Sequence, residues 1–259
     1  MTRVAVVGAA GRMGQFVLHA LRQFPDLELA AALERPDHPD LGKPAAPGVL
    51  LTGDLASGLT GADVAIDFST PATTRKVVAE AAARDVAMVV ATTGFSPDQR
   101  REIEGWGNKV ALLLSPNFSL GVNLLFELVA EAARRLPDYD LEVLELHHSA
   151  KVDAPSGTAL QLGEVAAHAR GTTLDQSGVY HREGQTGPRP RGAIGMQTLR
   201  AGTSVGEHTV FLAGPGERIE LTHRALSRET FASGAVRAAR WIAGRAPGLY
   251  SMTDVLREP

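Results

Sequence analysis

The residues best suited to chemistry lie together in the middle of the chain. Two adjacent histidines, His147 and His148, are followed closely by Lys151. Histidine exchanges protons near neutral pH, which suits a proton donor, and a lysine offers positive charge to a carboxylate or an imine nitrogen. On a strand the two histidines would point to opposite faces, but irregular backbone after the strand can bring both toward one cleft. We expect a proton-transfer site here that accepts an anionic substrate.

A helix predicted over residues 155–169 begins directly after this cluster. Its first residues, Pro155-Ser156-Gly157-Thr158, are typical of a helix N-terminus, with Ser156 or Asp153 as the capping residue. The amide groups of Gly157 and Thr158 would have no partners within the helix, and the helix dipole would favour an anion beside them. A substrate carboxylate fits such a position.

Two other interpretations of the cluster are structural histidines and a metal site. Each histidine taken singly is readily explained as structural or solvated, but the combination with a lysine and a glycine-containing helix start is not. Adjacent histidines chelate a metal poorly on regular structure, and the chain contains no cysteine. We therefore predict no metal site.

A second pattern, near the start of the chain, is typical of dinucleotide binding. Gly8-Ala9-Ala10-Gly11-Arg12-Met13-Gly14 follows a predicted strand and precedes a predicted helix. Glycines there allow a tight turn and a close approach of the backbone to a pyrophosphate. Glu34 lies about 20 residues after Gly14, the spacing expected for a carboxylate that binds the adenosine ribose. Arg35 suits the 2′-phosphate of NADP. The alternative for the glycine loop is a plain strand-to-helix turn, and the alternative for Arg35 is a solvated surface arginine.

Two further loops follow predicted strands. Thr92-Thr93-Gly94 comes after the strand at 87–91, and Ser115-Pro116-Asn117-Phe118 after the strand at 110–114. Ligands of open α/β sheets bind at the carboxyl ends of the strands, although Gly, Pro and Asn are also common in plain turns.

The elements that position these residues form two groups. Strands alternate with helices up to about residue 118, which predicts a doubly wound, mainly parallel sheet. Beyond it, a long helix at 120–136 and a strand at 141–147 precede three strands joined by glycine-containing turns, at 194–199, 207–213 and 218–223, which predict an antiparallel or mixed sheet. A last helix at 230–244 can belong to either group.

The composition excludes several classes of protein. The chain has 259 residues, 44% of them hydrophobic, a net charge of -3 and no cysteine. This balance does not indicate a nucleic-acid or membrane binder, and it excludes disulfides and cysteine nucleophiles. The first residues lack the features of a signal peptide, and no apolar run reaches the roughly 18 residues of a membrane span. We expect a soluble, cytoplasmic protein.

The chain resembles the dihydrodipicolinate reductase family. The segment from Glu145 to Ala159 reads E-x-H-H-x-x-K-x-D-x-P-S-G-T-A, which is similar to the signature of that family. GAAGRMG, ATTGF, SPNFSLGVN, REGQTGPR, GEHTV and GERIELTHRA are further stretches of resemblance, so that it covers essentially the whole chain. Ser115 is a small departure, because alanine is common there.

The resemblance implies an α/β enzyme with an N-terminal Rossmann-type domain and an α+β C-terminal domain with a mixed sheet. The first domain would span residues 1–118, completed by 228–259, and the second, at 119–227, would bind substrate and build a homotetramer. The implied reaction is hydride transfer from NADH or NADPH to the dihydrodipicolinate equivalent, formed from 4-hydroxy-tetrahydrodipicolinate, in diaminopimelate and lysine biosynthesis. The substrate is a small dicarboxylate.

The resemblance also implies roles for individual residues. His147 would be the general acid/base and Lys151 a proton donor, while His148, Gly157 and Thr158 would bind substrate. The implied cofactor-binding residues are Gly8, Ala9, Ala10, Gly11, Arg12, Met13, Glu34, Arg35, Ala91, Thr92, Thr93, Ser115, Pro116, Asn117 and Phe118.

Two other functions remain as alternatives. One is another two-domain dehydrogenase of aspartate-derived metabolites, although the acylating semialdehyde dehydrogenases need a cysteine, which this chain lacks. The other is a dinucleotide-sensing binding protein without catalysis, which would have no need of His147 and Lys151.

Overall fold

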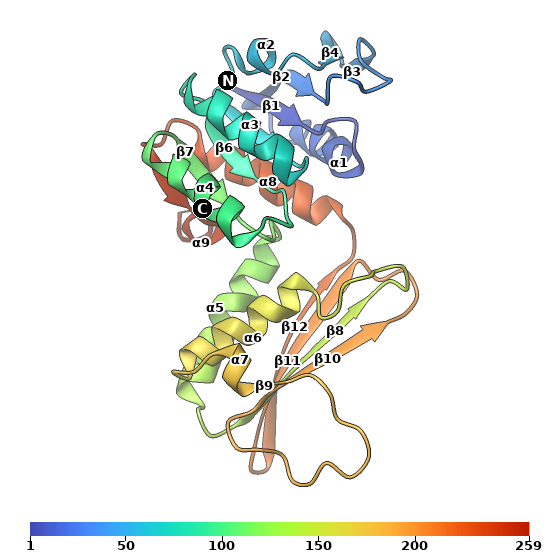
Figure 1. Cartoon of the computed structure of the whole chain (residues 1–259), viewed down its shortest axis with the longest axis vertical. Coiled ribbons are helices and arrows are strands. Elements are labelled where there is room, and N and C mark those ends of the chain that lie inside the picture. Colours follow the sequence, from blue (N-terminus) through green and yellow to red (C-terminus); the bar gives the residue numbers. More distant parts are fainter. Residues whose placement is uncertain (259) are drawn as a thin grey trace. The chain divides into compact units, whose positions relative to one another are not determined.

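The computed structural model describes residues 1–258, which form two compact units (Figure 1). The first unit comprises Met1–Leu120 together with the chain from Arg228 onward. The second unit comprises Gly121–Ser227. The chain therefore leaves the first unit once and returns to it.

The first unit is built on an eight-stranded sheet in the order β13-β7-β6-β5-β1-β2-β4-β3. Every neighbouring pair is parallel except β3 and β4, which are antiparallel. The strands are β1 (Thr2–Val7), β2 (Leu27–Leu33), β3 (Pro44–Ala46), β4 (Val49–Thr52), β5 (Val64–Asp67), β6 (Ala87–Val90), β7 (Ala111–Leu114) and β13 (Gly248–Tyr250).

Helices cover both faces of this sheet, which is why its central strands are apolar throughout. In β1, Val4 and Val6 belong to one hydrophobic core, while Ala5 and Val7 belong to the other. Alternate side chains of a strand point to opposite faces, so each face needs its own cover. The helices are α1 (Arg12–Leu21), α2 (Leu55–Leu59), α3 (Pro71–Ala82), α4 (Pro97–Gly105), the 3₁₀ helix η1 (Trp106–Asn108), α8 (Glu229–Ile242) and α9 (Met252–Arg257).

Local capping chemistry determines where several of these helices begin. Thr70 accepts a hydrogen bond from the Thr73 amide at the start of α3. Ser96 and Gln99 form a reciprocal capping box at the start of α4, and proline occupies the first turn of both helices.

The last long helix, α8, belongs to the first unit. Ala235, Val236 and Ile242 are fully buried in the same core as Val4 and Val6. Gly234 permits the close approach, because a Cβ atom there would lie 1.8 Å from the carbonyl oxygen of Phe118. The sequence pattern had left the placement of this helix open.

The second unit has a five-stranded mixed sheet in the order β12-β11-β8-β10-β9, with helices on one face (Figure 1). β10 runs parallel to β8, whereas β11 is antiparallel to both β8 and β12. The elements are α5 (Leu120–Arg135), β8 (Asp140–His147), α6 (Gly157–Ala169), α7 (Leu174–Ser177), β9 (Gly178–Val179), β10 (Ile194–Arg200), β11 (Gly206–Gly214) and β12 (Glu217–Ala225).

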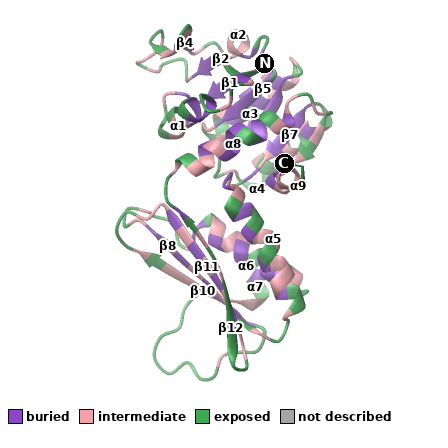
Figure 2. Cartoon of the chain, turned by 180° about the vertical axis from the view of Figure 1, so that it is seen from behind, coloured by how far each residue is buried: buried purple, intermediate pink, exposed green. Residues whose placement is uncertain are grey.

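Burial alternates along β8, as expected for a sheet covered on one face. Leu141, Val143, Glu145 and His147 are buried, and the residues between them are half-buried (Figure 2). Leu141 and Val143 pack with apolar residues of α5 and α6. Glu145 and His147 continue the same row, so two polar side chains are held on the inner face at the end of the strand.

The predicted α/β fold class is confirmed, including the parallel sheet and the mixed sheet. The helix predicted after the glycine loop ends at Leu21, and the helix predicted from residue 155 begins at Gly157. The short elements β3, β4, β9, β13, α2, α7 and α9 were not predicted, because they contain too few residues to display a hydrophobic period.

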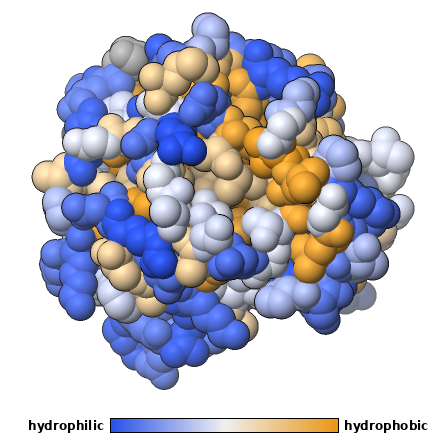
Figure 3. Space-filling model, turned by 90° about the horizontal axis from the view of Figure 1, so that it is seen from above, coloured by the Kyte–Doolittle hydropathy of each residue, from blue (hydrophilic) through white to orange (hydrophobic). Residues whose placement is uncertain are grey.

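In the space-filling view, hydrophilic side chains make up much of the visible face, interrupted by a band of apolar side chains (Figure 3). Among the described residues, no helix combines the length and the apolar character required to cross a bilayer.

Candidate active site

The glycine loop joins β1 to α1 in a conformation that needs its glycines. Gly8 has a φ of +76°, in the left-handed region that favours glycine. A Cβ atom at Gly14 would lie 2.1 Å from the carbonyl oxygen of Gly8, so any side chain would force the helix away from the loop. The predicted reason for these glycines, a tight turn packed against a helix, agrees with this geometry.

The N-terminus of α1 is suited to an anion. Gly11 is the N-cap, no side chain caps the helix, and its first turn carries no acidic residue. The backbone amides of the first turn and the positive end of the helix dipole therefore meet no competing carboxylate from that turn. These features fit the pyrophosphate of a dinucleotide.

Glu34 lies directly after β2 and is anchored to the glycine loop. Its Oε1 accepts the Ala10 amide at 3.1 Å, and its Oε2 accepts the Arg35 amide at 3.1 Å. The neighbouring Arg35 is exposed, and its Nε lies 3.5 Å from a carboxylate oxygen of Asp37. The structure thus places a fixed carboxylate and an accessible guanidinium side by side next to the loop.

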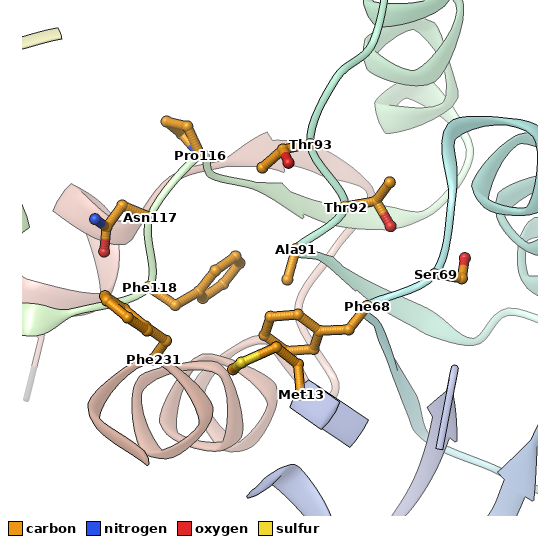
Figure 4. A pocket seen from close by; sticks show the side chains of 10 residues that line it. All are labelled: Met13, Phe68, Ser69, Ala91, Thr92, Thr93, Pro116, Asn117, Phe118 and Phe231. Carbon is orange, nitrogen blue, oxygen red and sulfur yellow. The ribbon is translucent and has the colours of Figure 1, made fainter. Parts of the chain in front are cut away.

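A cavity of about 330 Å³ lies within the first unit, beyond the ends of its strands (Figure 4). Seven of the predicted cofactor-binding residues line it: Met13, Ala91, Thr92, Thr93, Pro116, Asn117 and Phe118. Phe68, Ser69 and Phe231 complete the lining, and the rings of Phe68 and Phe118 lie 6.3 Å apart. One side of the cavity is therefore aromatic and the other polar, as a planar heteroaromatic ring with a polar substituent would require.

Ser115, the departure from the family pattern, stabilises the loop beside this cavity. Its hydroxyl donates to the carbonyl oxygen of Asn117 at 2.7 Å and accepts the Asn117 amide at 3.3 Å. Serine thus strengthens the turn that presents Pro116 and Asn117.

In the second unit, His147 ends β8 beside a buried carboxylate. Glu145 and His147 are only 1% and 8% exposed. The Nδ1–H group of His147 donates to Oε2 of Glu145, which leaves Nε2 as the other exchangeable position of the ring. A buried imidazole oriented in this way is suited to carry a proton.

Glu145 is the centre of a larger network. Its Oε1 accepts the Ser156 amide at 3.0 Å and Nη2 of Arg200 at 2.9 Å. Burial alone would raise the pKa of Glu145, but the hydrogen bonds from His147, Arg200 and Ser156 outweigh burial and lower it well below its usual range. Glu145 is therefore ionised at neutral pH.

The loop after β8 carries Lys151, whose ammonium contacts both carboxylate oxygens of Asp153 at 2.7 and 2.8 Å. The Lys151 amide donates to the carbonyl oxygen of His148, so the loop turns back on itself. His148 lies just beyond the strand, and its amide donates to the Ser204 carbonyl at 2.8 Å. Asp153 thus pairs with Lys151 and does not cap α6.

Ser156 is the N-cap of α6, and its hydroxyl accepts the Ala159 amide at 3.2 Å. Gly157 and Thr158 are the first two residues of the helix after this cap. Gly157 is exposed, and a Cβ atom there would meet nothing within 4 Å. The start of α6 therefore presents an exposed glycine at the positive end of the helix dipole, and its use as an anion site stays a prediction.

His208, on β11, packs against both Ser156 and His147. Its Nε2 lies 3.2 Å from the Ser156 hydroxyl, and its ring centre lies 5.2 Å from that of His147. Burial, followed by the nearby His147, lowers the pKa of His208 to about 4. His208 is consequently neutral at pH 7 and adds no second positive charge beside His147.

Glu145, His147 and His208 place ligand-type atoms within 4.8 Å of one another, which raises the question of a metal. The Glu145 carboxylate already accepts hydrogen bonds from three N–H donors, one of them a guanidinium. A cation would have to displace these donors and bind beside a positive charge. The arrangement fits a hydrogen-bonded acid–base network better than a metal centre.

Sequence reasoning did not identify Glu145, Arg200 or His208 as members of the site. The signal for Glu145 was available, because residues two apart on a strand share a face with each other. Arg200 and His208 lie on other strands, and only the strand register brings them to His147. Phe231 was missed for the same reason, since its helix is distant in sequence from the cavity.

Both halves of the chain match family models. Residues 2–118 match the model described as "Dihydrodipicolinate reductase, N-terminus", and residues 121–256 match "Dihydrodipicolinate reductase, C-terminus".

Curated relatives match over nearly the full length. The 4-hydroxy-tetrahydrodipicolinate reductase of Anaeromyxobacter dehalogenans (strain 2CP-C) is 51% identical, over 99% of this chain and 98% of the relative. That of Syntrophotalea carbinolica is 47% identical, over 99% of each. Among solved structures, a dipicolinate-bound dihydrodipicolinate reductase from Paenisporosarcina sp. TG-14 is 27% identical, covers 97% of both chains and has a TM-score of 0.80.

These findings confirm the expected NAD(P)H-dependent oxidoreductase activity and its place in diaminopimelate and lysine biosynthesis. They disfavour both the unrelated dehydrogenase and the non-catalytic sensor, since the relatives are named as this reductase along their whole length. With both of its units matched and its relatives about half identical, the chain belongs to the dihydrodipicolinate reductase family.

Proposed function

We propose that the first unit binds NADH or NADPH, and that the second unit binds a small dicarboxylate imine and protonates it during reduction. The glycine loop, the start of α1 and the cavity beside Phe118 support the first assignment. The network around Glu145 and the start of α6 support the second. The two domains thus have separate tasks. Residues 1–118 and 228–259 bind the cofactor, and residues 119–227 bind the substrate.

In the first unit, the amides at the start of α1 hold the pyrophosphate and Glu34 binds the adenosine ribose. Gly8, Ala9, Ala10, Gly11, Arg12 and Met13 form the cradle, and Arg35 offers charge to a 2′-phosphate. Ala91, Thr92, Thr93, Ser115, Pro116, Asn117 and Phe118 surround the nicotinamide. The bound dinucleotide supplies the hydride.

In the second unit, His147 supplies the proton that the reduction requires. Glu145 holds Nδ1–H, so the ring presents Nε2 with a fixed orientation. Adding hydride to a carbon of a conjugated imine leaves a negative centre elsewhere, and that centre takes a proton from Nε2 of the imidazolium. The buried, ionised Glu145 stabilises the imidazolium before this transfer.

Lys151, His148, Gly157 and Thr158 hold the two carboxylates of the substrate. The amides at the start of α6 and the Lys151 ammonium offer hydrogen bonds and positive charge to carboxylate oxygens. Lys151 exchanges its contact with Asp153 for the substrate and is placed to act as a second proton donor. The solved relative with bound dipicolinate, a dicarboxylate, supports this choice of substrate.

We also propose a homotetramer that works in the cytoplasm, on the basis of the resemblance to the family. Size-exclusion chromatography with light scattering gives the mass directly. A monomer or dimer at assay concentrations would contradict the tetramer.

The single observation that carries the catalytic assignment is the buried hydrogen bond between Glu145 and His147. His147→Gln should lower kcat by roughly 10²- to 10⁴-fold, the usual contribution of a general acid, while NADH binding is retained. The assay follows NADH and NADPH oxidation with substrate generated in place from pyruvate and aspartate semialdehyde.

His181→Gln is the matched control, because His181 lies in an exposed loop. It should keep wild-type turnover. Normal turnover by His147→Gln, measured beside this control, would remove His147 from the reaction. No oxidation of either dinucleotide by the wild-type chain would contradict the proposed substrate.

A further inference from the structure

Arg200, at the end of β10, joins the acid–base pair to the loop that carries Lys151. In the register of β10 and β8, Arg200 stands beside His147. Its Nη2 donates to Oε1 of Glu145 at 2.9 Å and to the carbonyl oxygen of Asp153 at 2.6 Å. Its Nη1 donates to the carbonyl oxygen of Leu199 at 2.7 Å. One guanidinium thus contacts the partner of the proton donor and the backbone beside the Lys151 loop.

The carboxylate of Glu145 is shared between two positive groups whenever His147 is protonated. Its side chain is fully buried, and that of Arg200 is only 19% exposed, so their interaction is weakly screened. Arg200 is permanently charged and takes one carboxylate oxygen, while His147 takes the other. Arg200 therefore reduces the attraction that Glu145 exerts on the proton of His147.

The other groups that face His147 do not replace Arg200 in this role. His208, on β11, is neutral at pH 7, and His223 follows it across the sheet on β12, where burial lowers its pKa as well. Lys151 and Asp153, on the loop, neutralise each other in one ion pair. Among the groups compared, Glu145 on β8 and Arg200 on β10 carry the net charges next to the ring.

We propose that Arg200 is a positioning residue of the reductase, which weakens the hold of Glu145 on the proton of His147 and fixes the Lys151 loop through the Asp153 carbonyl. This inference rests on the proposed role of His147 in proton transfer. It makes the imidazolium a better acid for each turnover, and it keeps Lys151 near the proton donor.

The electrostatic part is tested by the pH at which His147 loses its proton, followed by NMR of the full chain labelled in its histidines, with NADH bound. His147→Gln identifies the signal. Arg200→Gln should raise this pH, because removal of a nearby like charge favours the imidazolium. Glu145→Gln should lower it, because the stabilising carboxylate is gone.

Arg200→Lys distinguishes the effect of the positive charge from the effect of the guanidinium geometry. It also provides a second test if Arg200→Gln folds poorly. A lysine keeps the positive charge but cannot bridge Glu145, Asp153 and Leu199 as the guanidinium does. The titration of His147 should then stay near that of the wild type, while KM for the dicarboxylate rises several-fold. Arg218→Gln removes an exposed arginine from the same sheet and should change neither quantity.

An unchanged His147 titration in Arg200→Gln would overturn the proposal. So would equal shifts in Arg200→Lys and Arg200→Gln, because charge would then not be the cause. The two proposals can fail separately. If His147→Gln remains fully active but the titration shifts as expected, the catalytic role of His147 is wrong while the influence of Arg200 on it stands.

Discussion

At both candidate sites a carboxylate is fixed by, or fixes, a neighbouring group through hydrogen bonds. Glu145 orients His147, and Glu34 is itself held by the amides of Ala10 and Arg35. The two carboxylates differ in their environment. Glu145 is buried and bound by charged donors, whereas Glu34 is half-buried and bound by backbone amides. A buried carboxylate raises the proton affinity of its partner, and a half-buried carboxylate is suited to accept hydrogen bonds from hydroxyl groups.

Arg35 provides a prediction at this scale. Its guanidinium is exposed, and its contact with Asp37 is long, at 3.5 Å between nitrogen and oxygen. It is therefore available to a 2′-phosphate, which NADPH has and NADH lacks. Arg35→Ala should weaken NADPH binding by roughly tenfold or more, in line with about 1.5–3 kcal/mol for a hydrogen bond to a charged group.

Titration of dinucleotide fluorescence measures this effect without catalysis. NADH affinity should change little, so the ratio of the two dissociation constants is the decisive quantity. An equal loss for both dinucleotides would show that Arg35 does not distinguish them.

At the scale of elements, the junctions between strands and helices carry the proposed function. The β1–α1 junction places a helix N-terminus beside a glycine loop, and the β8–α6 junction places another beside His148 and Lys151. The two helix starts differ in their caps, because α6 has the side-chain cap Ser156 and α1 begins after Gly11 without a side-chain cap. The Ser156 hydroxyl accepts the amide of Ala159, the third residue of α6.

Gly14 provides the prediction for these junctions. A Cβ atom there would lie 2.1 Å from the Gly8 carbonyl oxygen, so Gly14→Ala must push α1 away from the loop. We expect the unfolding free energy to fall by about 1–3 kcal/mol, the usual cost of overpacking, and dinucleotide binding to be largely lost. Thermal melts and fluorescence titration measure the two effects.

Gly105→Ala is the control, because a Cβ atom at this helical position would meet nothing within 4 Å. Its stability should stay within about 1 kcal/mol of the wild type. If Gly14→Ala bound the dinucleotide with wild-type affinity, the close contact between the glycine loop and α1 would not be required for dinucleotide binding.

At the scale of the whole molecule, the two units should differ in how pH affects their stability. The second unit buries His208, whose pKa is lowered from 6.5 to about 4. As the pH falls from 6.5 toward 4, His208 becomes protonated in the unfolded chain but stays neutral in the folded unit. The second unit should therefore lose stability between about pH 6.5 and 4, by roughly 3 kcal/mol from this residue.

His208→Gln should remove this contribution, so the difference in unfolding free energy between wild type and variant should shrink as the pH falls. Both tryptophans, Trp106 and Trp241, lie in the first unit, which allows their fluorescence to report that unit separately from far-UV circular dichroism. A difference that stays constant from pH 7 to pH 4 would show that His208 titrates normally in the folded chain.

Much of the first unit could be predicted because its signals are local. The strand, the glycine loop, α1 and Glu34 follow one another in the chain, and their spacing alone predicts a dinucleotide-type fold. The segment from Glu145 to Ala159 is equally local, so the candidate proton donor, the candidate cation and the helix start were recognised together. Hydrophobic periods and turn residues are properties of adjacent positions, which a sequence displays directly.

The sequence by itself thus determined the α/β class, the two groups of elements and most of the candidate residues. The hydrophobic pattern left the place of α8 open, and the family resemblance assigned it to the first domain. Only the tertiary structure decided which of its residues enter the core, that Phe231 lines the cavity, and that Arg200 and His208 surround Glu145 and His147. These contacts join residues from separate strands and helices. They depend on strand register and on the packing of side chains across the sheet, which no local spacing specifies.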